Sequence, residues 1–180
     1  MKNIVLFGDS FLGRLGKKYI SQFELLVPSA MVHNCAAGGL DTADGLARAG
    51  YIAGLKPDFV VLSFGANDAE RGEISEEKFE HNLEGIVKAF VGSQVILLLC
   101  PPAYDPADPV GTKDFNDKIF RYNARARAVA ERAGAKVVDS EKIFSPYLDR
   151  GENYHDEDGL HLNDLGYEVW IKALIDNFLW

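Results

Sequence analysis

The chain has little cysteine and no long hydrophobic run. Its two cysteines, Cys35 and Cys100, cannot build the disulfide framework of a small secreted domain. We expect both thiols to stay reduced, although a single bridge between them stays open. The longest apolar run, Val95–Cys100, has the length of a strand and falls far below the ~18 residues that a membrane span needs. The four apolar residues after Met1-Lys2-Asn3 are also too few for a signal peptide. These absences predict a cytoplasmic protein without a membrane span.

The chain also has fewer basic than acidic residues. The chain carries 19 Lys and Arg against 27 Asp and Glu, which gives a formal net charge of −8. A broad nucleic-acid-binding surface needs a basic face, so this balance excludes nucleic acid as an expected partner. The 180 residues, 47% of them hydrophobic, are enough for one domain with a real core. With no internal repeat and no low-complexity linker, we expect a single domain over residues 1–180.

Short apolar runs alternate with helical patterns along the chain. Five runs are rich in β-forming residues: Ile4–Phe7, Met31–Asn34, Phe59–Phe64, Val95–Cys100 and Lys136–Val138. Most are continuously apolar, which is typical of strands buried on both faces of a parallel sheet. Alternating strands and helices therefore predict an α/β fold, a three-layer α/β/α sandwich.

Apolar residues at three- and four-residue steps predict helices over residues 12–26, 79–90, 119–133 and 165–174. Ser75 is a plausible N-cap of the second helix, and Gly134 is a good end for the third. The third helix also carries a set of arginines that we expect to form a solvated face: Arg121, Arg125 and Arg132. The proline-rich stretch 101–109 follows a strand and predicts a long loop.

Polar residues follow the strands at the point where each one ends. In open α/β sheets, ligands bind beyond the carboxyl ends of the strands. The segments at these ends are Gly8-Asp9-Ser10, Asn34 to Gly39, Gly65-Ala66-Asn67-Asp68 and Pro101 to Tyr104, with Asp158 and His161 ahead of the last helix. We therefore expect the functional side chains to meet at this edge.

These segments hold the parts needed for acyl transfer. A serine such as Ser10 needs a base to take its proton, and the base needs a partner that fixes its tautomer. Asp158 and His161 are three residues apart, so one turn can hold the carboxylate against the imidazole. The backbone N–H groups of Gly39 and Ser10 and the amide of Asn67 can bind the oxyanion of a tetrahedral intermediate.

The sequence resembles the SGNH/GDSL hydrolase family of esterases and lipases. Four family blocks occur in the family's order: Phe7 to Ser10, Asn34 to Gly39, Gly65 to Asp68, and Asp158 to His161. Any one block is weak, but four in order over most of the chain are a specific signal. The resemblance implies a flavodoxin-like fold with a five-stranded parallel sheet in the order 2-1-3-4-5.

The resemblance also implies roles for single residues. Ser10 would be the nucleophile, His161 the general base, and Asp158 the residue that orients the base. The backbone N–H groups of Ser10 and Gly39 and the side chain of Asn67 would form the oxyanion hole. The second block contains two adjacent glycines, so Gly38 stays an alternative to Gly39. The family uses no metal and no organic cofactor. It spans carboxylesterases, thioesterases, phospholipid hydrolases and carbohydrate deacetylases, and for this chain we expect a small-molecule ester as substrate.

Each of these residues also has a purely structural interpretation. Ser10 could cap the first helix, and Asp68 could be a plain turn residue. His155 competes with His161, although Asn163 can cap the last helix behind His161 and hold its loop. We expect Asp9 to pin its turn through hydrogen bonds to backbone N–H groups.

The substrate is the least determined part of this prediction. No apolar lid is visible in a chain this short, which favours ester hydrolysis of short acyl groups over long-chain lipids. The 101–114 loop, with Tyr104, is the candidate for shaping the pocket. A carbohydrate O-acetyl deacetylase and a thioesterase of the same fold stay alternatives. A non-catalytic, flavodoxin-like binding module and an inactive hydrolase are alternatives of another class.

Overall fold

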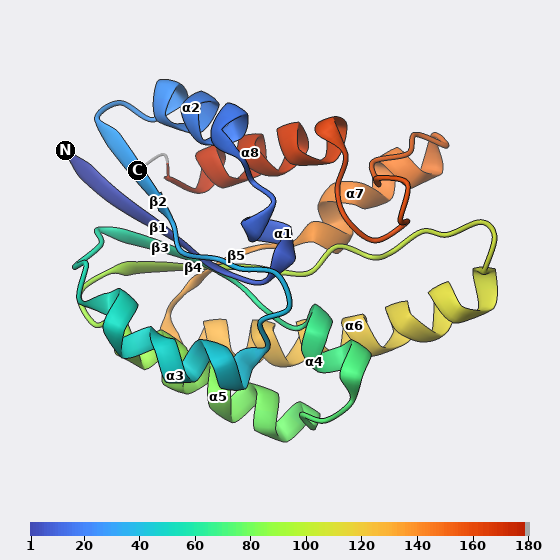
Figure 1. Cartoon of the computed structure of the whole chain (residues 1–180), viewed down its shortest axis with the longest axis horizontal. Helices are drawn as coiled ribbons and strands as arrows, with labels where there is room; N and C mark the ends of the chain where they lie inside the picture. The colour runs from blue at the N-terminus through green and yellow to red at the C-terminus, as the bar shows by residue number, and fades with distance from the viewer. Residues whose placement is uncertain (179–180) are drawn as a thin grey trace.

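A computed structural model describes residues 1–178 and contains one parallel sheet of five strands (Figure 1). Its strands, in spatial order, are β2 (Ala30–Asn34), β1 (Lys2–Gly8), β3 (Phe59–Ser63), β4 (Gln94–Leu98) and β5 (Lys136–Val138). This order confirms the predicted α/β class and the 2-1-3-4-5 topology. Residues 179 and 180 of the expected single domain lie outside the described residues.

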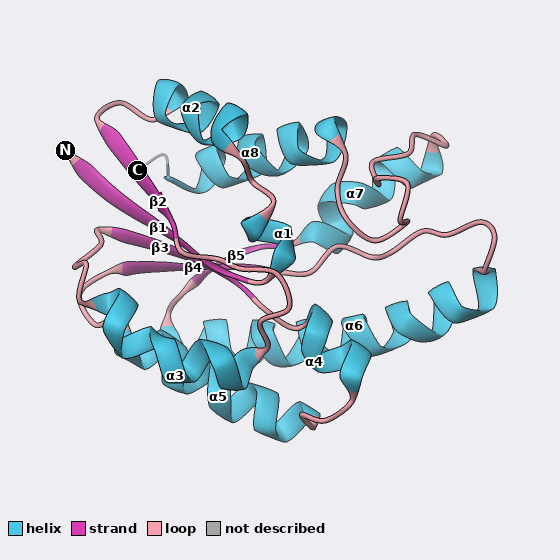
Figure 2. Cartoon of the chain, viewed as in Figure 1, coloured by secondary structure: helices cyan, strands magenta, loops and turns pink. Residues whose placement is uncertain are grey.

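Helices cover both faces of the sheet (Figure 2). Above it in Figure 1 lie α2 (Lys17–Leu26), α7 (Ser140–Asp149) and α8 (Asp164–Phe178). Below it lie α3 (Thr42–Ala53), α5 (Glu76–Ala89) and α6 (Pro109–Ala133). The short helices α1 (Ser10–Gly13) and α4 (Ala66–Arg71) begin at the carboxyl ends of β1 and β3. All residues of β3 are buried, as expected for a strand covered on both faces.

β1 and β3 approach each other closely at their carboxyl ends. Gly8 pairs with Ser63 in the parallel ladder, and a Cβ atom on Gly8 would lie only 2.1 Å from the Ser63 carbonyl oxygen. The next residue, Asp9, donates its backbone N–H to that carbonyl at 3.1 Å. Glycine is therefore required at position 8 for the chain to turn from β1 into α1 at this point.

The predicted helix 12–26 is wrong in its extent. The chain forms α1 and α2 with a break at Arg14–Gly16, and Gly16 is extended at the N-cap of α2. Leu26, expected on the buried face, is half exposed. Leu15 and Tyr19 are both buried, although they belong to different segments. The three- and four-residue spacing of apolar residues therefore continues through the break, and the sequence pattern does not show where the first helix ends.

The proline-rich stretch lies in a loop up to Asp108, as predicted, but the loop expected over 101–114 ends there and the helix expected over 119–133 begins earlier. α6 begins at Pro109, where proline at the first helical position lacks only an N–H that would have no partner within the helix. Asp108 caps it, since its Oδ1 accepts the Gly111 N–H at 2.9 Å. Gly134 ends α6 in the left-handed conformation, as predicted.

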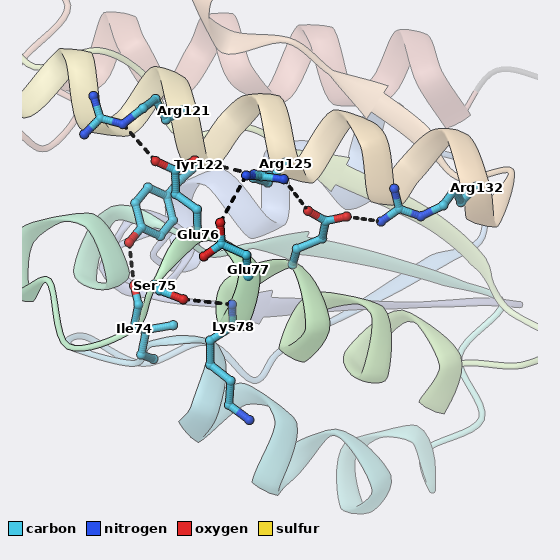
Figure 3. Close-up of polar contacts among 10 residues, drawn as sticks. Ile74, Ser75, Glu76, Glu77, Lys78, Arg121, Tyr122, Arg125 and Arg132 are labelled. Atoms are coloured by element: carbon cyan, nitrogen blue, oxygen red, sulfur yellow. Dashed lines mark hydrogen bonds and ion pairs between the residues drawn. The ribbon is translucent and has the colours of Figure 1, made fainter.

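The arginines of α6 are exposed or half exposed, as expected for a solvated face, and they also form ion pairs with a neighbouring helix. Figure 3 shows them reaching across to the acidic residues of α5. Arg121 Nε lies 2.9 Å from Glu76, while Arg125 and Arg132 lie 3.1 and 2.6 Å from the two oxygens of Glu80. These ion pairs join two helices on the same side of the sheet. The sequence of α6 alone does not predict these pairs.

Both cysteines are free, which settles the open question of a bridge: Cys100 is buried and Cys35 is half buried. Within residues 1–178, no helix combines the length and the apolar character that crossing a membrane requires.

Candidate active site

Ser10, His161 and Asp158 form a continuous chain of hydrogen bonds beyond the carboxyl end of β1. His161 Nε2 lies 2.8 Å from Ser10 Oγ, and His161 Nδ1 lies 2.7 Å from Asp158 Oδ2. Ser10 is 151 residues from His161 in the sequence. The fold thus brings together the three residues that the sequence selected.

Ser10 is the first residue of α1 and not its cap. The cap is Asp9, whose Oδ1 accepts the Phe11 N–H at 3.0 Å. The interpretation of Ser10 as a helix cap is therefore wrong, while the expectation that Asp9 pins the turn is confirmed. Because its hydroxyl does not cap the helix, Ser10 Oγ can face the imidazole.

His161 and Asp158 lie in a tight loop between α7 and α8, which we call the catalytic loop (residues 155–162). Its ends are joined by an antiparallel bridge between His155 and Leu162 and by a 2.7 Å bond from Asp156 N–H to the His161 carbonyl. Asp158 Oδ1 accepts the backbone N–H groups of Leu160 and His161, at 3.0 and 2.8 Å. The backbone thus fixes one oxygen of Asp158 and leaves the other for the imidazole.

Asp158 is ionised at neutral pH. Partial burial acts to raise its pKa, but hydrogen bonds from the backbone and imidazole of His161 and from Leu160 N–H outweigh burial and lower the pKa to about 2. Arg14 adds a guanidinium 3.3 Å from Asp158 Oδ2. A carboxylate in this place stabilises an imidazolium on His161.

His155 occupies a different position from His161. Its Nε2 lies 2.7 Å from the Pro102 carbonyl, so this nitrogen carries the proton and donates. Burial lowers the pKa of His155, against the opposing effect of the Pro102 carbonyl. His155 thus links the catalytic loop to the segment after β4, whereas His161 contacts Ser10.

The expected oxyanion donors other than Ser10 lie on two segments, residues 35–41 and α4. A Cβ on Gly38 would stand 3.9 Å from Ser10 Cβ, and Gly39 has a φ of +80°, a conformation that favours glycine. Asn67 belongs to α4 and donates one N–H of its amide to the Leu40 carbonyl at 2.9 Å. This is the one hydrogen bond of the Asn67 amide found within residues 1–178.

Asn34 holds the segment after β2 against the chain that follows Ser10. Its Nδ2 donates to the carbonyls of Leu12 and Leu15 at 2.8 and 3.2 Å, and its Oδ1 accepts the Ala36 N–H at 3.1 Å. The side chain thus joins the end of β2 to the segment that follows Ser10.

The interpretation of Asp68 as a plain turn residue is wrong. It is buried, and its carboxylate accepts both the N–H and the hydroxyl of Thr42 at the start of α3. Burial raises its pKa, although the Thr42 hydrogen bonds oppose this. Burial also raises the pKa of Asp9, to about 7, with a smaller contribution from the charge of Asp68. Two carboxyl groups thus lie in the protein interior beneath the site.

Sequence reasoning missed two arginines at the site. Arg14 contacts Asp158, and Arg71 donates to the Gly39 carbonyl at 2.8 Å. Each arginine follows a selected residue by four positions, Ser10 and Asn67 respectively. Residues four apart on a helix share a face, and this spacing could have identified both arginines.

Tyr104 lies beside the catalytic loop. Its backbone N–H donates to the Gly159 carbonyl at 2.7 Å, and its half-exposed ring stacks at 6.3 Å from the His155 ring. It lines a cavity of about 670 Å³ between the 102–109 segment, α6 and α7, whose lining does not include Ser10 or His161. A substrate-binding role for Tyr104 therefore stays a prediction.

The arrangement of the four segments at the carboxyl edge of a 2-1-3-4-5 parallel sheet is the one that the resemblance to the SGNH/GDSL hydrolases implies. The model of the GDSL-like lipase/acylhydrolase family matches residues 6–169, and the chain belongs to this family. No curated protein sequence matched the chain.

Solved structures with the same fold include relatives described as esterases and lipases. A lipase/acylhydrolase from Enterococcus faecalis is 29% identical with a TM-score of 0.83, over 99% of this chain and 95% of that one. LAE5, described as an α/β hydrolase enzyme from the metagenome of Lake Arreo in Spain, is 22% identical with a TM-score of 0.80, over 97% and 94%. The acetylxylan esterase Axe2 from Geobacillus stearothermophilus is 19% identical with a TM-score of 0.83, over 99% and 94%.

Proposed function

We propose that the protein is a serine esterase that hydrolyses carboxylic esters of short acyl groups through an acyl-enzyme. The observation that carries this proposal is the chain of hydrogen bonds from Ser10 through His161 to Asp158. Membership of the GDSL-like lipase/acylhydrolase family supports it.

The proton positions follow from the charge of Asp158. An ionised carboxylate only accepts hydrogen bonds, so His161 Nδ1 carries the proton of the neutral ring. His161 Nε2 then presents its lone pair to Ser10 Oγ at 2.8 Å. As Oγ attacks the ester carbonyl, Nε2 takes its proton and later gives it to the leaving alcohol. Water, deprotonated by the same nitrogen, then attacks the acyl carbon, and Nε2 returns this proton to Ser10 Oγ as the bond to the acyl group breaks and the acid leaves.

The oxyanion of the tetrahedral intermediate would be bound by the backbone N–H groups of Ser10 and Gly39 and by the second amide N–H of Asn67. Gly38 is the alternative to Gly39, since both lie in the segment next to Ser10. Replacing Asn67 by Ala should lower kcat by about 10²–10³-fold, the usual effect of losing one such donor. A full kcat in Asn67→Ala would contradict this role.

The proposal of short acyl groups rests on the short chain, in whose sequence no long apolar lid segment is visible, and Tyr104 is the proposed contact for substrate. The similarity to acetylxylan esterases makes acetylated sugars the second substrate class to examine. Thioesters are a third class within the same chemistry. The cytoplasmic location predicted from the sequence stays a prediction, which cell fractionation would test.

The test is hydrolysis of p-nitrophenyl esters from acetate to palmitate by the wild type and by Ser10→Ala, with folding checked by circular dichroism. We expect the wild type to prefer the short esters, acetate through butyrate, and Ser10→Ala to be inactive. Equal activity in both proteins would refute the mechanism, and a preference for palmitate would refute the acyl length. Failure on all aryl esters, with activity on acetylated sugars, would favour the deacetylase. Bound flavin in the purified protein would favour the non-catalytic alternative.

A further inference from the structure

The segment that carries Gly39 is held in place by side chains from α4. Residues 35–41 form neither helix nor strand, and within them Leu40 N–H reaches the Ala37 carbonyl only at 3.5 Å. By contrast, Arg71 Nη2 donates to the Gly39 carbonyl at 2.8 Å, and Asn67 Nδ2 donates to the Leu40 carbonyl at 2.9 Å. Two successive carbonyls of this segment are thus bonded to one short helix.

Gly39 is the residue whose position most needs such support. Glycine at a φ of +80° has no side chain to restrict it, and its backbone can rotate more freely than that of any other residue. A Cβ at this position would lie 3.4 Å from Arg71 Nη2, so the guanidinium packs directly against the glycine. Because an oxyanion donor is effective only when its direction is fixed in advance, a free glycine would be a poor donor.

We infer that Arg71 is a positioning residue, whose bond to the Gly39 carbonyl holds the Gly39 N–H in the direction of the oxyanion. This inference rests on the proposed function. It makes α4 a single unit that supplies one donor, Asn67, and fixes the other, Gly39. Arg71 itself is not assigned a contact with substrate.

Arg71 has a second contact that must be separated from the first. Its Nη1 lies 3.5 Å from Asp41 Oδ2, and Asp41 caps α3 through its other oxygen, which accepts the N–H groups of Ala43 and Asp44. Asp41→Asn keeps an oxygen for the cap and removes the charge that faces Arg71. This variant is therefore the matched control, because it breaks the ion pair and leaves the bond to Gly39.

The experiment measures kcat and KM on p-nitrophenyl acetate for Arg71→Ala, Arg71→Lys and Asp41→Asn. For Arg71→Ala we expect kcat to fall about 10- to 100-fold, as for an Å-scale misplacement, with KM changed by less than about twofold. Inhibition by an arylboronic acid should weaken along with kcat, because its tetrahedral adduct with serine places an oxygen where the oxyanion forms. Arg71→Lys should recover part of kcat, since one donor can still reach the carbonyl. Asp41→Asn should stay near the wild type.

Two results would overturn the inference. One is an unchanged kcat in folded Arg71→Ala, and the other is an equal loss in Asp41→Asn, which would assign the effect to the ion pair with α3. Ser10→Ala separates this inference from the proposed function. If Ser10→Ala is inactive while Arg71→Ala is fully active, only the inference fails. If Ser10→Ala keeps the activity, the proposed function fails, and the inference fails with it.

Discussion

Replacing Asp158 by asparagine should force His161 into the wrong tautomer. Asp158 Oδ1 accepts two backbone N–H groups, from Leu160 and His161, at 3.0 and 2.8 Å. An amide nitrogen cannot accept these bonds, so the side chain in Asp158→Asn would place its oxygen there and its NH2 group toward the imidazole. That NH2 would donate to Nδ1, and the ring proton would move to Nε2. Nε2 would then face Ser10 Oγ as a donor and could no longer take its proton.

The expected loss in kcat is about 10⁴-fold, which corresponds to about 5 kcal/mol of transition-state stabilisation. The assay is p-nitrophenyl acetate hydrolysis, combined with ¹⁵N NMR of the His161 ring to identify the protonated nitrogen. Asp156→Asn is the control, because Asp156 lies in the same loop and 3.7 Å from Arg14, while its side chain makes no contact with the His161 ring. The reasoning is refuted if Asp158→Asn keeps kcat within about tenfold, or if Nδ1 stays protonated in the variant.

Three further predictions concern stability. Burial raises the pKa of Asp9 from 3.8 to about 7. The folded chain therefore binds more protons than the unfolded chain between these pH values, and the free energy of unfolding should fall as pH rises. About three units at roughly 1.36 kcal/mol give a fall of up to about 4 kcal/mol. Chemical denaturation from about pH 4 to 8 should find this fall in the wild type and lose it in Asp9→Asn. Asn34→Ala removes three hydrogen bonds to backbone groups and should cost about 1–3 kcal/mol in the same assay. Glu80→Gln breaks the ion pairs with Arg125 and Arg132 and should lower the Tm at low salt. The difference in Tm from the wild type should shrink at about 0.5 M NaCl, where charges are screened. A salt-independent difference would contradict an ionic cause.

Local patterns were sufficient to predict the sheet but not the helix boundaries. The three central strands, β1, β3 and β4, contain continuous apolar runs, and burial on both faces leaves few other structures for them. The break between α1 and α2 went unseen because the same apolar spacing continues through it, and only the extended backbone at Gly16 separates the two helices. The role of the α6 arginines depends on the register between α5 and α6, which no pattern within one helix contains.

The candidate site was predictable where residues act within one turn. The spacing of Asp158 and His161 allows a carboxylate–imidazole contact, and Asp9 next to Ser10 suggests a cap. The approach of α4 to residues 39–41 cannot be predicted from any local sequence pattern. The contact between Arg71 and Gly39 joins residues 32 apart, and it requires β1 and β3 to be neighbours in the sheet.

The catalytic loop is held in place by backbone atoms of the segment that also carries Tyr104. Pro102 accepts from His155, and the Tyr104 N–H donates to the Gly159 carbonyl, so both bonds use main-chain groups of residues 102–104. Main-chain bonds of this kind do not depend on the identity of the side chain at position 104. The Tyr104 ring can therefore be exchanged for another without removing the support of His161. The support of His161 is thus separate from the side chain that lines the neighbouring cavity.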